Sequence, residues 1–291
     1  MSLNKARTQT GLAGIGLRAP HYSDILIQNP SIGFVEIHSE NFFAKGGKTQ
    51  HVLKKVSELY PLSFHGVSLS LGSVDEPDSL HLKRLKELVH LYKPTLVSEH
   101  VSWSINEKTY LNDLLPLPYT QEALDVLSHN VSIVQNELGR QILMENPSSY
   151  LTYNLKNQMH EGDFMRELAH KTGCGILLDI NNVYVSAENL GENALDYLKK
   201  VPLNLVKEVH LAGHDHKKLT SGEILKVDTH GDYVCDEVWS LYDMFLNMCN
   251  KPVATLIEWD NNIPPLNVLC EEAQKASLML QNFKEVQHHV A

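Results

Sequence analysis

Ionisable side chains stand at the ends of several short apolar runs in this chain. Glu145 follows the apolar residues 142–144, and Asp179 follows the apolar residues 176–178. A lone charge at the mouth of a dry core is costly, and a bound cation would offset that cost. Four histidines and four carboxylates share this pattern or lie on one later loop: His65, His100, Glu145, Asp179, His210, Asp228, His230 and Glu258. We therefore expect a metal site.

Eight candidate ligands are too many for a single ion. A mononuclear site uses three or four ligands, so this set indicates two or three metal ions with bridging carboxylates. Asp228 and His230 stand two residues apart, which places both side chains on one face of an extended segment. Any one of the histidines alone is more often a hydrogen-bonded structural residue. Their recurrence at successive strand ends is what favours metal binding.

The ligand types narrow the choice of metal. Imidazole and carboxylate ligands without thiolate suit zinc, iron or manganese, and they disfavour copper(I) and iron–sulfur clusters. Iron with open coordination positions would activate dioxygen, whereas zinc would activate water for hydrolysis. The spacing of the residues does not decide between these two chemistries.

The strand ends belong to a regular alternation of strands and helices. Short apolar runs predict eight strands, at residues 12–17, 34–38, 62–67, 95–101, 141–145, 175–180, 206–211 and 254–259. Helical periodicity fills the intervals, most clearly from Thr120 to Leu138, with Gly139 after the end. Eight strands alternating with eight helices predict a single (β/α)8 TIM barrel over residues 1–291, with its core at about 11–285. The metal site would then lie at the carboxyl-terminal rim of the strands.

The main rival fold is an open, doubly wound parallel sheet. That fold is disfavoured because Gly14-Ile15-Gly16 does not continue into a glycine-rich phosphate loop. Two long connections, residues 102–118 and 212–233, leave the carboxyl ends of strands. Both are candidate lids or substrate walls.

Composition excludes several classes of protein. Hydrophobic residues make up 43% of the 291 residues and charged residues 21%, which indicates a folded globular protein. A net charge of −10 without a basic tract argues against nucleic acid as a partner. There is no membrane-length apolar run and no signal-peptide pattern, so we expect a cytoplasmic protein without membrane contact. The four cysteines form no C-x-x-C pair and are expected to be buried thiols.

Several ordered motifs in the chain resemble those of one known family. They are Gly14–Arg18, Glu36–Asn41, Phe64–Gly66, Ser98–His100, Glu145–Pro147, Leu178–Asn182, His210–His214 and Glu258–Asp260. The chain resembles, from about residue 11 to residue 273, the bacterial TIM-barrel proteins called multinuclear non-heme iron-dependent oxidative enzymes, which include relatives of the methanobactin biosynthesis oxidase. The fold is also similar to that of endonuclease IV and xylose isomerase, whose metals occupy the same rim.

The resemblance implies an activity and a set of ligands. It implies an oxidase with two or three iron ions that uses dioxygen to modify cysteine residues of a ribosomally synthesised precursor peptide, as in the maturation of copper-binding peptides. Many members work with a small partner protein that presents the leader of the peptide. The implied metal ligands are the eight residues above together with Asn182, and the implied catalytic residues among them are Glu145, Asp179 and Glu258. Four further residues are expected to position the peptide or the oxygen: Arg18, Asn41, Ser102 and Trp103.

Two other functions remain open at this point. A zinc- or manganese-dependent hydrolase or sugar isomerase of the endonuclease IV and xylose isomerase type would share the ligands but not the redox chemistry. A non-enzymatic barrel that binds metal or docks a partner is the third interpretation. Dependence of activity on oxygen would separate the first two.

Overall fold

Eight parallel strands close into a barrel in the computed structural model, which describes residues 13–106 and 109–290. Each strand pairs with the next one around the barrel, and the last pairs with the first. The strands, in order around the barrel, are β1 (Ala13–Gly16), β2 (Val35–His38), β3 (Leu62–His65), β4 (Leu96–His100), β7 (Leu143–Glu145), β8 (Gly175–Asp179), β9 (Val206–Leu211) and β12 (Ala254–Ile257). The predicted (β/α)8 barrel is confirmed. Leu12, where the first strand was predicted to begin, lies outside the described residues.

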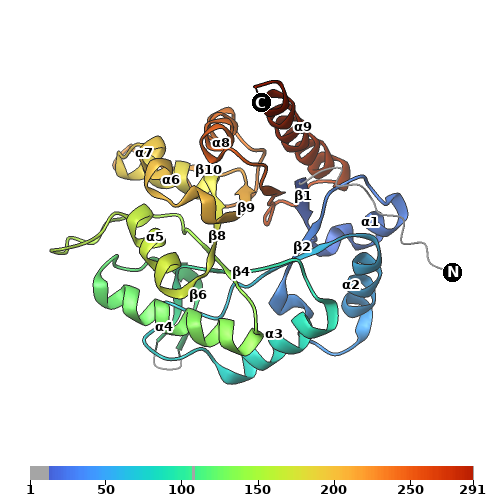
Figure 1. Ribbon diagram of the computed structural model, residues 1–291, viewed down its shortest axis with the longest axis horizontal. Coiled ribbons are helices and arrows are strands. Elements are labelled where there is room, and N and C mark those ends of the chain that lie inside the picture. The colour runs from blue at the N-terminus through green and yellow to red at the C-terminus, as the bar shows by residue number, and fades with distance from the viewer. Residues whose placement is uncertain (1–12, 107–108, 291) are drawn as a thin grey trace.

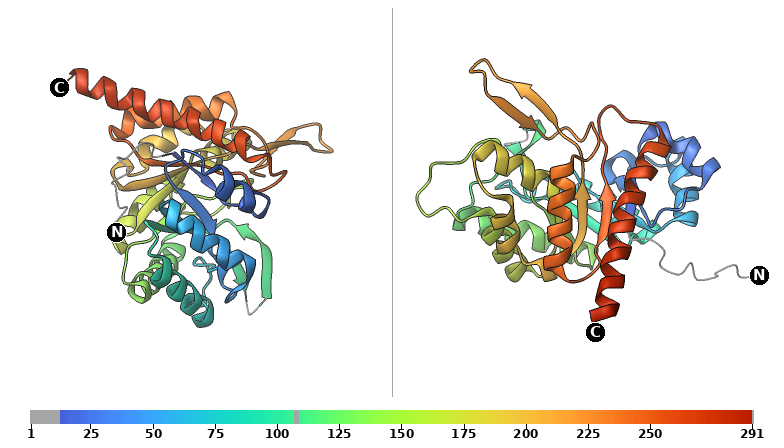
Figure 2. Two further views of the ribbon diagram at one scale, coloured as in Figure 1. Left: turned by 90° about the vertical axis from the view of Figure 1, so that its right-hand side faces the viewer. Right: turned by 90° about the horizontal axis from the view of Figure 1, so that it is seen from above.

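Helices surround the barrel, as Figures 1 and 2 show. The helix predicted from Thr120 is confirmed: the Thr120 side chain accepts a hydrogen bond from the Ala123 amide, and Gly139 ends the helix with a φ of 65°. Two helices follow β8 instead of one, so the described residues form nine α-helices and not eight. They are α1 (Tyr22–Gln28), α2 (Gly47–Leu59), α3 (Ser79–Tyr92), α4 (Gln121–Leu138), α5 (Glu161–Thr172), α6 (Ile180–Leu190), α7 (Ala194–Lys200), α8 (Asp236–Cys249) and α9 (Leu266–Val290). Three short 3-10 turns complete the set: η1 (Ala19–His21), η2 (Ser39–Phe42) and η3 (Leu203–Leu205).

The inner face of the barrel is polar near the carboxyl ends of the strands. Alternate residues of a strand point to opposite faces, so Ser63 and His65 of β3 share a face that Phe64 does not. Ser63 contacts Glu36 of the neighbouring strand β2 and Glu208 of β9 across the barrel, and the second contact identifies this face as the inner one. The apolar residues at the other positions, such as Phe64 and Val209, are buried in the hydrophobic core. The fold therefore places a buried polar cluster at one rim.

Both long connections contain an antiparallel pair of strands. The first pair is β5 (Trp103–Asn106) with β6 (Thr109–Leu115), and the second is β10 (Asp215–Lys218) with β11 (Ile224–Val227). The sequence predicted only loops here, because neither segment has the apolar run by which the barrel strands were found. The β10–β11 hairpin projects well beyond the barrel (Figure 2). Among the described helices, none combines the length and the apolar character that crossing a bilayer requires.

Gly213 lies near the start of the connection between β9 and α8, where the chain contacts Asp232 and Tyr233 at the end of the same connection. A Cβ atom at this position would overlap the backbone oxygen of Asp232 and crowd the backbone of Tyr233. Backbone atoms cannot move aside as a flexible side chain can, so only glycine fits without a shift of the chain.

We expect Gly213→Ala to lower the free energy of unfolding by about 1–3 kcal/mol, the usual cost of an overpacked buried position. Urea denaturation of the variant and the wild type measures the difference. Ser221→Ala, in the exposed turn of the neighbouring hairpin, is the control and should change stability by less than about 0.5 kcal/mol. Equal stability of both variants would contradict the close approach.

Candidate metal centre

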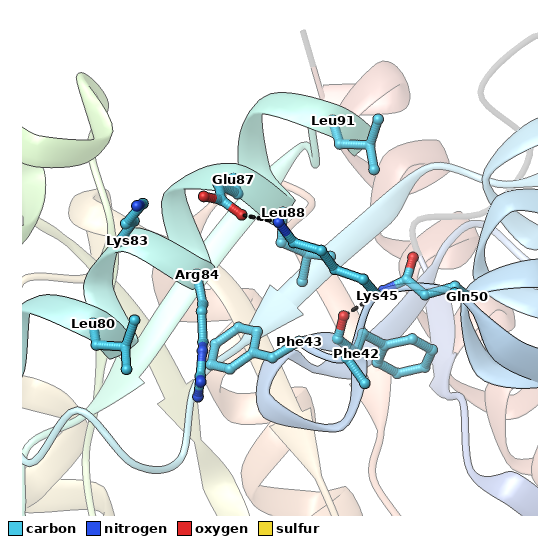
Figure 3. A pocket seen from close by; sticks show the side chains of 12 residues that line it. Phe42, Phe43, Lys45, Gln50, Leu80, Lys83, Arg84, Glu87, Leu88 and Leu91 are labelled. Atoms are coloured by element: carbon cyan, nitrogen blue, oxygen red, sulfur yellow. Dashed lines mark hydrogen bonds and ion pairs between the residues drawn. The ribbon is translucent and has the colours of Figure 1, made fainter.

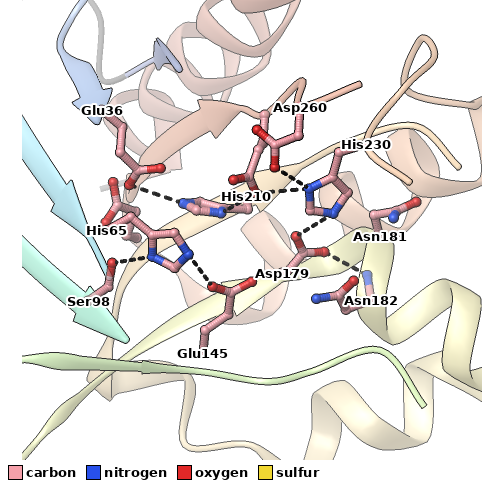
Figure 4. A network of polar contacts seen from close by, with 12 residues as sticks. Glu36, His65, Ser98, Glu145, Asp179, Asn181, Asn182, His210, His230 and Asp260 are labelled. Carbon is pink, nitrogen blue, oxygen red and sulfur yellow. Dashed lines mark hydrogen bonds and ion pairs between the residues drawn. The ribbon is translucent and has the colours of Figure 1, made fainter. Parts of the chain in front are cut away.

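Two groups of buried ligating side chains share the carboxylate of Glu145. Glu145 forms one group with His65 and His100, and a second group with residues of the next strands. The second group consists of Glu145, Asp179, His210 and Glu258, and in each group the ligating atoms lie within 4.8 Å of one another. Neighbouring parallel strands place these residues side by side at the same height in the barrel. In the sheet register His100 pairs with Glu145, and Asp179 pairs with His210. Figure 4 shows the side chains of His65, Glu145, Asp179 and His210 converging.

The first group offers neutral imidazoles beside a carboxylate. His65 Nε2 and His100 Nδ1 each lie 3.3 Å from Glu145 Oε2. Ser98 Oγ, 2.8 Å from His65 Nδ1, fixes the orientation of that ring. Burial lowers the pKa of His65 well below its usual value, and it lowers that of His100 to about 4. Both rings are therefore uncharged at neutral pH. Their Nε2 atoms lie 2.8 Å apart in a hydrogen bond, which a cation between the rings would replace.

The second group contains buried carboxylate oxygens that lack hydrogen bonds. Among the described residues, neither oxygen of Glu145 makes a hydrogen bond, and neither does Asp179 Oδ2. Burial raises the pKa of Asp179 to about 7 and that of Glu145 well above its usual value. Burial acts in the same direction on Glu258, but His210 and His230 outweigh it and hold the pKa of Glu258 well below its usual value. Cations at these oxygens would satisfy them, so the residues fit metal ions.

Asp228 and His230 add a third set of ligating atoms beside Asp179. His230 Nε2 lies 2.7 Å from Asp228 Oδ1 and 3.8 Å from Asp179 Oδ2. The first of these contacts is an ion pair, and Asn182 Oδ1 makes no hydrogen bond among the described residues. Asn182 donates its amide hydrogen to the Asn146 carbonyl, so its oxygen is left for another ligand. All nine residues proposed as ligands from the sequence thus lie at this rim.

Arg18 lies behind this centre and is held by acidic side chains. Its guanidinium forms an ion pair with Asp260 at 2.5 Å and lies 3.5 Å from Glu258. A third contact is with His38, whose Nε2 atom lies 2.9 Å from Arg18 Nη2. Arg18 is buried and does not line the cavity above the centre. Its charge is thus paired with acidic side chains, and a contact of Arg18 with substrate stays a prediction.

A cavity of about 230 Å³ opens above the ligating residues. It is lined on one side by the centre and on the other by side chains from loops and from the β5–β6 hairpin, including Asp113 and Tyr150. The other three predicted substrate contacts do not line it either: Asn41 is exposed on η2, Ser102 is buried, and Trp103 lines a separate cavity beside Val74.

Sequence reasoning missed several residues of this region. Asp260 and Glu36 stand two positions from Glu258 and His38, and this spacing on an extended segment was the available signal. Tyr150 and Asp113 lie on irregular or hairpin segments, and no pattern in the sequence marks them.

A second acidic layer lies beneath the centre. The Ser63 hydroxyl is 3.1 Å from a carboxylate oxygen of Glu36 and 3.1 Å from one of Glu208. Burial and the neighbouring Glu36 raise the pKa of Glu208 to about 8. Glu36 Oε2 lies 3.4 Å from His210 Nε2 (Figure 4). The Nε2 atom of His210 therefore faces the Glu36 carboxylate. A carboxylate in this position orients histidine ligands in metal sites.

A larger cavity lies away from the rim residues, between α3 and the segment that precedes α2. Its volume is about 790 Å³, and Phe42, Phe43 and Leu88 are among its apolar walls (Figure 3). Its charged residues include Lys45 and Glu87, which form an ion pair. No histidine lines this cavity, so it does not share the chemistry of the rim.

Comparison with known proteins gives one family and one fold. Residues 12–281 match the family described as RiPP precursor modification enzyme MbnB/TglH/ChrH. A UPF0276 protein of Psychromonas ingrahamii is 43% identical, over 98% of this chain and 99% of that protein. D-psicose 3-epimerase from Clostridium cellulolyticum is similar in structure, with a TM-score of 0.57 and 13% identity over 93% of this chain and 98% of that one. Endonuclease IV from Thermus thermophilus gives a TM-score of 0.54 and 14% identity, over 94% and 98%. At these identities the two structures show a shared xylose isomerase-like barrel alone.

The shifted pKa values predict how the stability of metal-free protein depends on pH. Glu145 and Asp179 have folded-state pKa values above their usual ones, and so do His210 and His230, where carboxylates outweigh the effect of burial. The folded state therefore holds protons that the unfolded state has released. Stability should fall between about pH 6.5 and pH 8, by about 1.4 kcal/mol per pH unit for each proton that the folded state still retains. Asp179, with a pKa of about 7, contributes only to the lower part of this range.

Urea unfolding of chelator-treated protein at both ends of this range measures the fall. Added Zn²⁺ or Fe²⁺ should reverse it, because a bound cation takes the place of the protons. A fall of the same size with and without metal would contradict a metal centre at these residues.

Proposed function

We propose that this chain, which belongs to the RiPP precursor modification enzyme family MbnB/TglH/ChrH, is a multinuclear non-heme iron oxidase that uses dioxygen to modify cysteine in a ribosomally synthesised peptide. The observation that carries the proposal is the position of Glu145. Its carboxylate belongs to both groups of ligating atoms, and neither oxygen has a hydrogen-bond partner among the described residues. A carboxylate placed in this way suits two adjacent cations.

The ligand set supports iron as the resident metal. Histidine and carboxylate ligands with open positions are characteristic of iron(II) sites that use dioxygen. When bound, such ions would supply electrons to dioxygen and lower the pKa of a coordinated thiol. Glu145 and the two neutral imidazoles of His65 and His100 would hold one ion. Asp179, His210 and Glu258, again with Glu145, would hold a second, and Asp228, His230 and Asn182 are the remaining donors.

The size of the cavity supports a side chain of a peptide as the substrate. A cavity of about 230 Å³ lies below the usual volume of small-molecule sites, about 300–1,000 Å³. It can admit a cysteine side chain and a short stretch of backbone. Recognition of the remaining peptide must then occur outside the cavity, which is consistent with a small partner protein that holds the leader.

Tyr150 is placed to bind that backbone. Its hydroxyl oxygen accepts hydrogen bonds from the Asp228 amide at 2.9 Å and from the Ser148 hydroxyl at 3.3 Å. With both acceptor positions used, the hydroxyl hydrogen is left to donate into the cavity that Tyr150 lines. We infer that it donates to a carbonyl of the peptide.

The charge of the site disfavours a nucleic acid substrate. The cavity lining includes five carboxylate residues and no lysine or arginine: Asp113, Glu145, Asp228, Glu258 and Asp260. A phosphodiester would meet these carboxylates without the basic contacts on which phosphate binding depends. The likeness to endonuclease IV therefore does not extend to the groups that would hold DNA.

Metal analysis tests the number and identity of the ions. Protein purified without oxygen should contain two or more irons per chain. Glu145→Gln should lose more than half of the iron, because the residue belongs to both groups, whereas Asp228→Asn should lose at most one ion. Glu223→Gln, an exposed carboxylate on the β10–β11 turn, is the matched control and should keep full occupancy.

Tightly held zinc or manganese that iron does not displace would favour a hydrolase or isomerase instead. Wild-type protein without metal would refute the proposed function.

Activity tests the chemistry and the role of Tyr150. Modification of a cysteine-bearing precursor encoded with the enzyme should occur in air and stop under argon, as followed by the mass of the peptide. Tyr150→Phe should raise the KM for the peptide about tenfold, the value of one hydrogen bond, while the iron held by His65, His100 and Glu145 is kept. Turnover under argon would contradict an oxidase, and an unchanged KM would contradict the role of Tyr150.

A further inference from the structure

His214 is joined to the metal centre by a continuous chain of polar contacts. His214 Nδ1 lies 3.0 Å from Asn181 Oδ1, and Asn181 Nδ2 donates to Asp228 Oδ1 at 2.8 Å. The same Asp228 oxygen lies 2.7 Å from His230 Nε2. His214 itself does not line the cavity. We propose that His214 is a positioning residue, which orients the Asn181 amide and thereby holds the Asp228 carboxylate in place at the centre.

The direction of each hydrogen bond follows from the chemistry of the groups. An ionised carboxylate only accepts, so Asn181 must turn its NH2 group towards Asp228. Its amide oxygen then faces His214, and His214 must carry its hydrogen on Nδ1. Without that donor the amide would keep only its bond to Asp228, and it could rotate together with the carboxylate. His214 thus anchors the amide from its other end and fixes the direction of the bond to Asp228.

Packing on α6 holds the His214 ring in the required orientation. The ring lies against Tyr184, with 5.4 Å between the centroids, and Tyr184 stands three residues after Asn181 on the same face of the helix. Asn181 is fully buried in the first turn of α6, which Asp179 caps through the Asn182 amide. One helix face therefore supplies both the bonding partner and the surface on which the ring packs.

The contacts of Asn181 with His214 and Asp228 also lie at the base of the β10–β11 hairpin. His214 directly precedes β10, Asp228 directly follows β11, and Asp215 pairs with Val227 between them. Asn181 contacts both His214 and Asp228, so it joins the two ends of the projecting hairpin to the rim.

Other contacts fix the backbone near Asp228 but not its carboxylate. The Asp228 amide donates to Tyr150, and Asn189 bonds both backbone groups of Lys226. Loss of His214 should therefore leave the hairpin folded while the Asp228 carboxylate loses its fixed direction. This inference rests on the proposed metal centre, and its test separates the two.

The test is titration of metal-free protein with Co²⁺, followed by equilibrium dialysis and by visible absorption. Wild-type protein should bind at least two ions. In His214→Ala one ion should bind about 10–100-fold more weakly, the usual effect of losing a group that orients a ligand, and the Co²⁺ absorption of that ion should change. The ion held by His65, His100 and Glu145 should keep its affinity.

Two further variants distinguish positioning from general damage. His214→Asn keeps an N–H donor near the position of Nδ1 and should restore Co²⁺ binding to within about threefold of the wild type. His216→Ala removes the exposed neighbouring ring, which touches the His214 ring with 5.3 Å between the centroids but makes no contact with Asn181 among the described residues. Because the bond to Asn181 is kept, this variant should bind Co²⁺ within about threefold of the wild type.

Equal Co²⁺ binding in wild type and His214→Ala would overturn the proposal. So would weaker binding of every ion in both the alanine and the asparagine variants, with a lower free energy of unfolding, because a purely structural role predicts that pattern. Wild-type protein that binds no Co²⁺ would refute the metal centre and this inference together.

Discussion

Buried negative charge is the constraint on which this structure depends. Glu145, Asp179 and Glu208 are fully buried, in a barrel whose outer layer is apolar. Their charge must be balanced by protons or by cations, because water does not reach them. The histidines at the same rim do not all respond alike: His65 and His100 are kept neutral, whereas His210 is kept charged by the carboxylates of Glu36 and Glu258 against the effect of burial. Metal ions would replace this arrangement of protons with fixed positive charge.

The barrel fixes the ligating side chains by holding the backbone at each strand end. Asn146 directly follows Glu145, and its side chain bonds both the amide and the carbonyl of Asp179 at 2.9 Å. Its own carbonyl accepts from Asn182. One asparagine therefore couples the ends of β7 and β8 to the first turn of α6. This explains why three candidate ligands from two strands and a helix keep a common geometry.

How much the sequence could predict depends on the range of the interaction. Strand ends are local features, so the pattern that ends in Glu145 or Asp179 predicted both the barrel and its ligating rim. The partners of Arg18 could not be predicted in this way, because Asp260 and Glu258 lie more than two hundred positions further along the chain and meet Arg18 only after the barrel closes. The two hairpins were missed for a different reason, since their strands carry mostly polar or exposed residues and lack the apolar signal of the core.

The ligating residues differ in how firmly the fold holds them, and this difference bears on function. His65, His100 and Glu145 project from barrel strands, whereas His230 lies on a loop and has a φ of 47°, an unfavourable value for a residue with a side chain. Hydrogen bonds from the Asp260 and Asn261 amides to the His230 carbonyl hold this conformation. The barrel strands thus hold their candidate ligands through the sheet, and the loop after β11 holds its candidate ligands through a few specific contacts. His65, His100 and Glu145 line the cavity together with Asp228 and His230, so a substrate in it would meet candidate ligands of both kinds. The geometry of the loop-borne residues depends on contacts such as those to the His230 carbonyl, and a substitution there can shift these residues without disturbing the barrel.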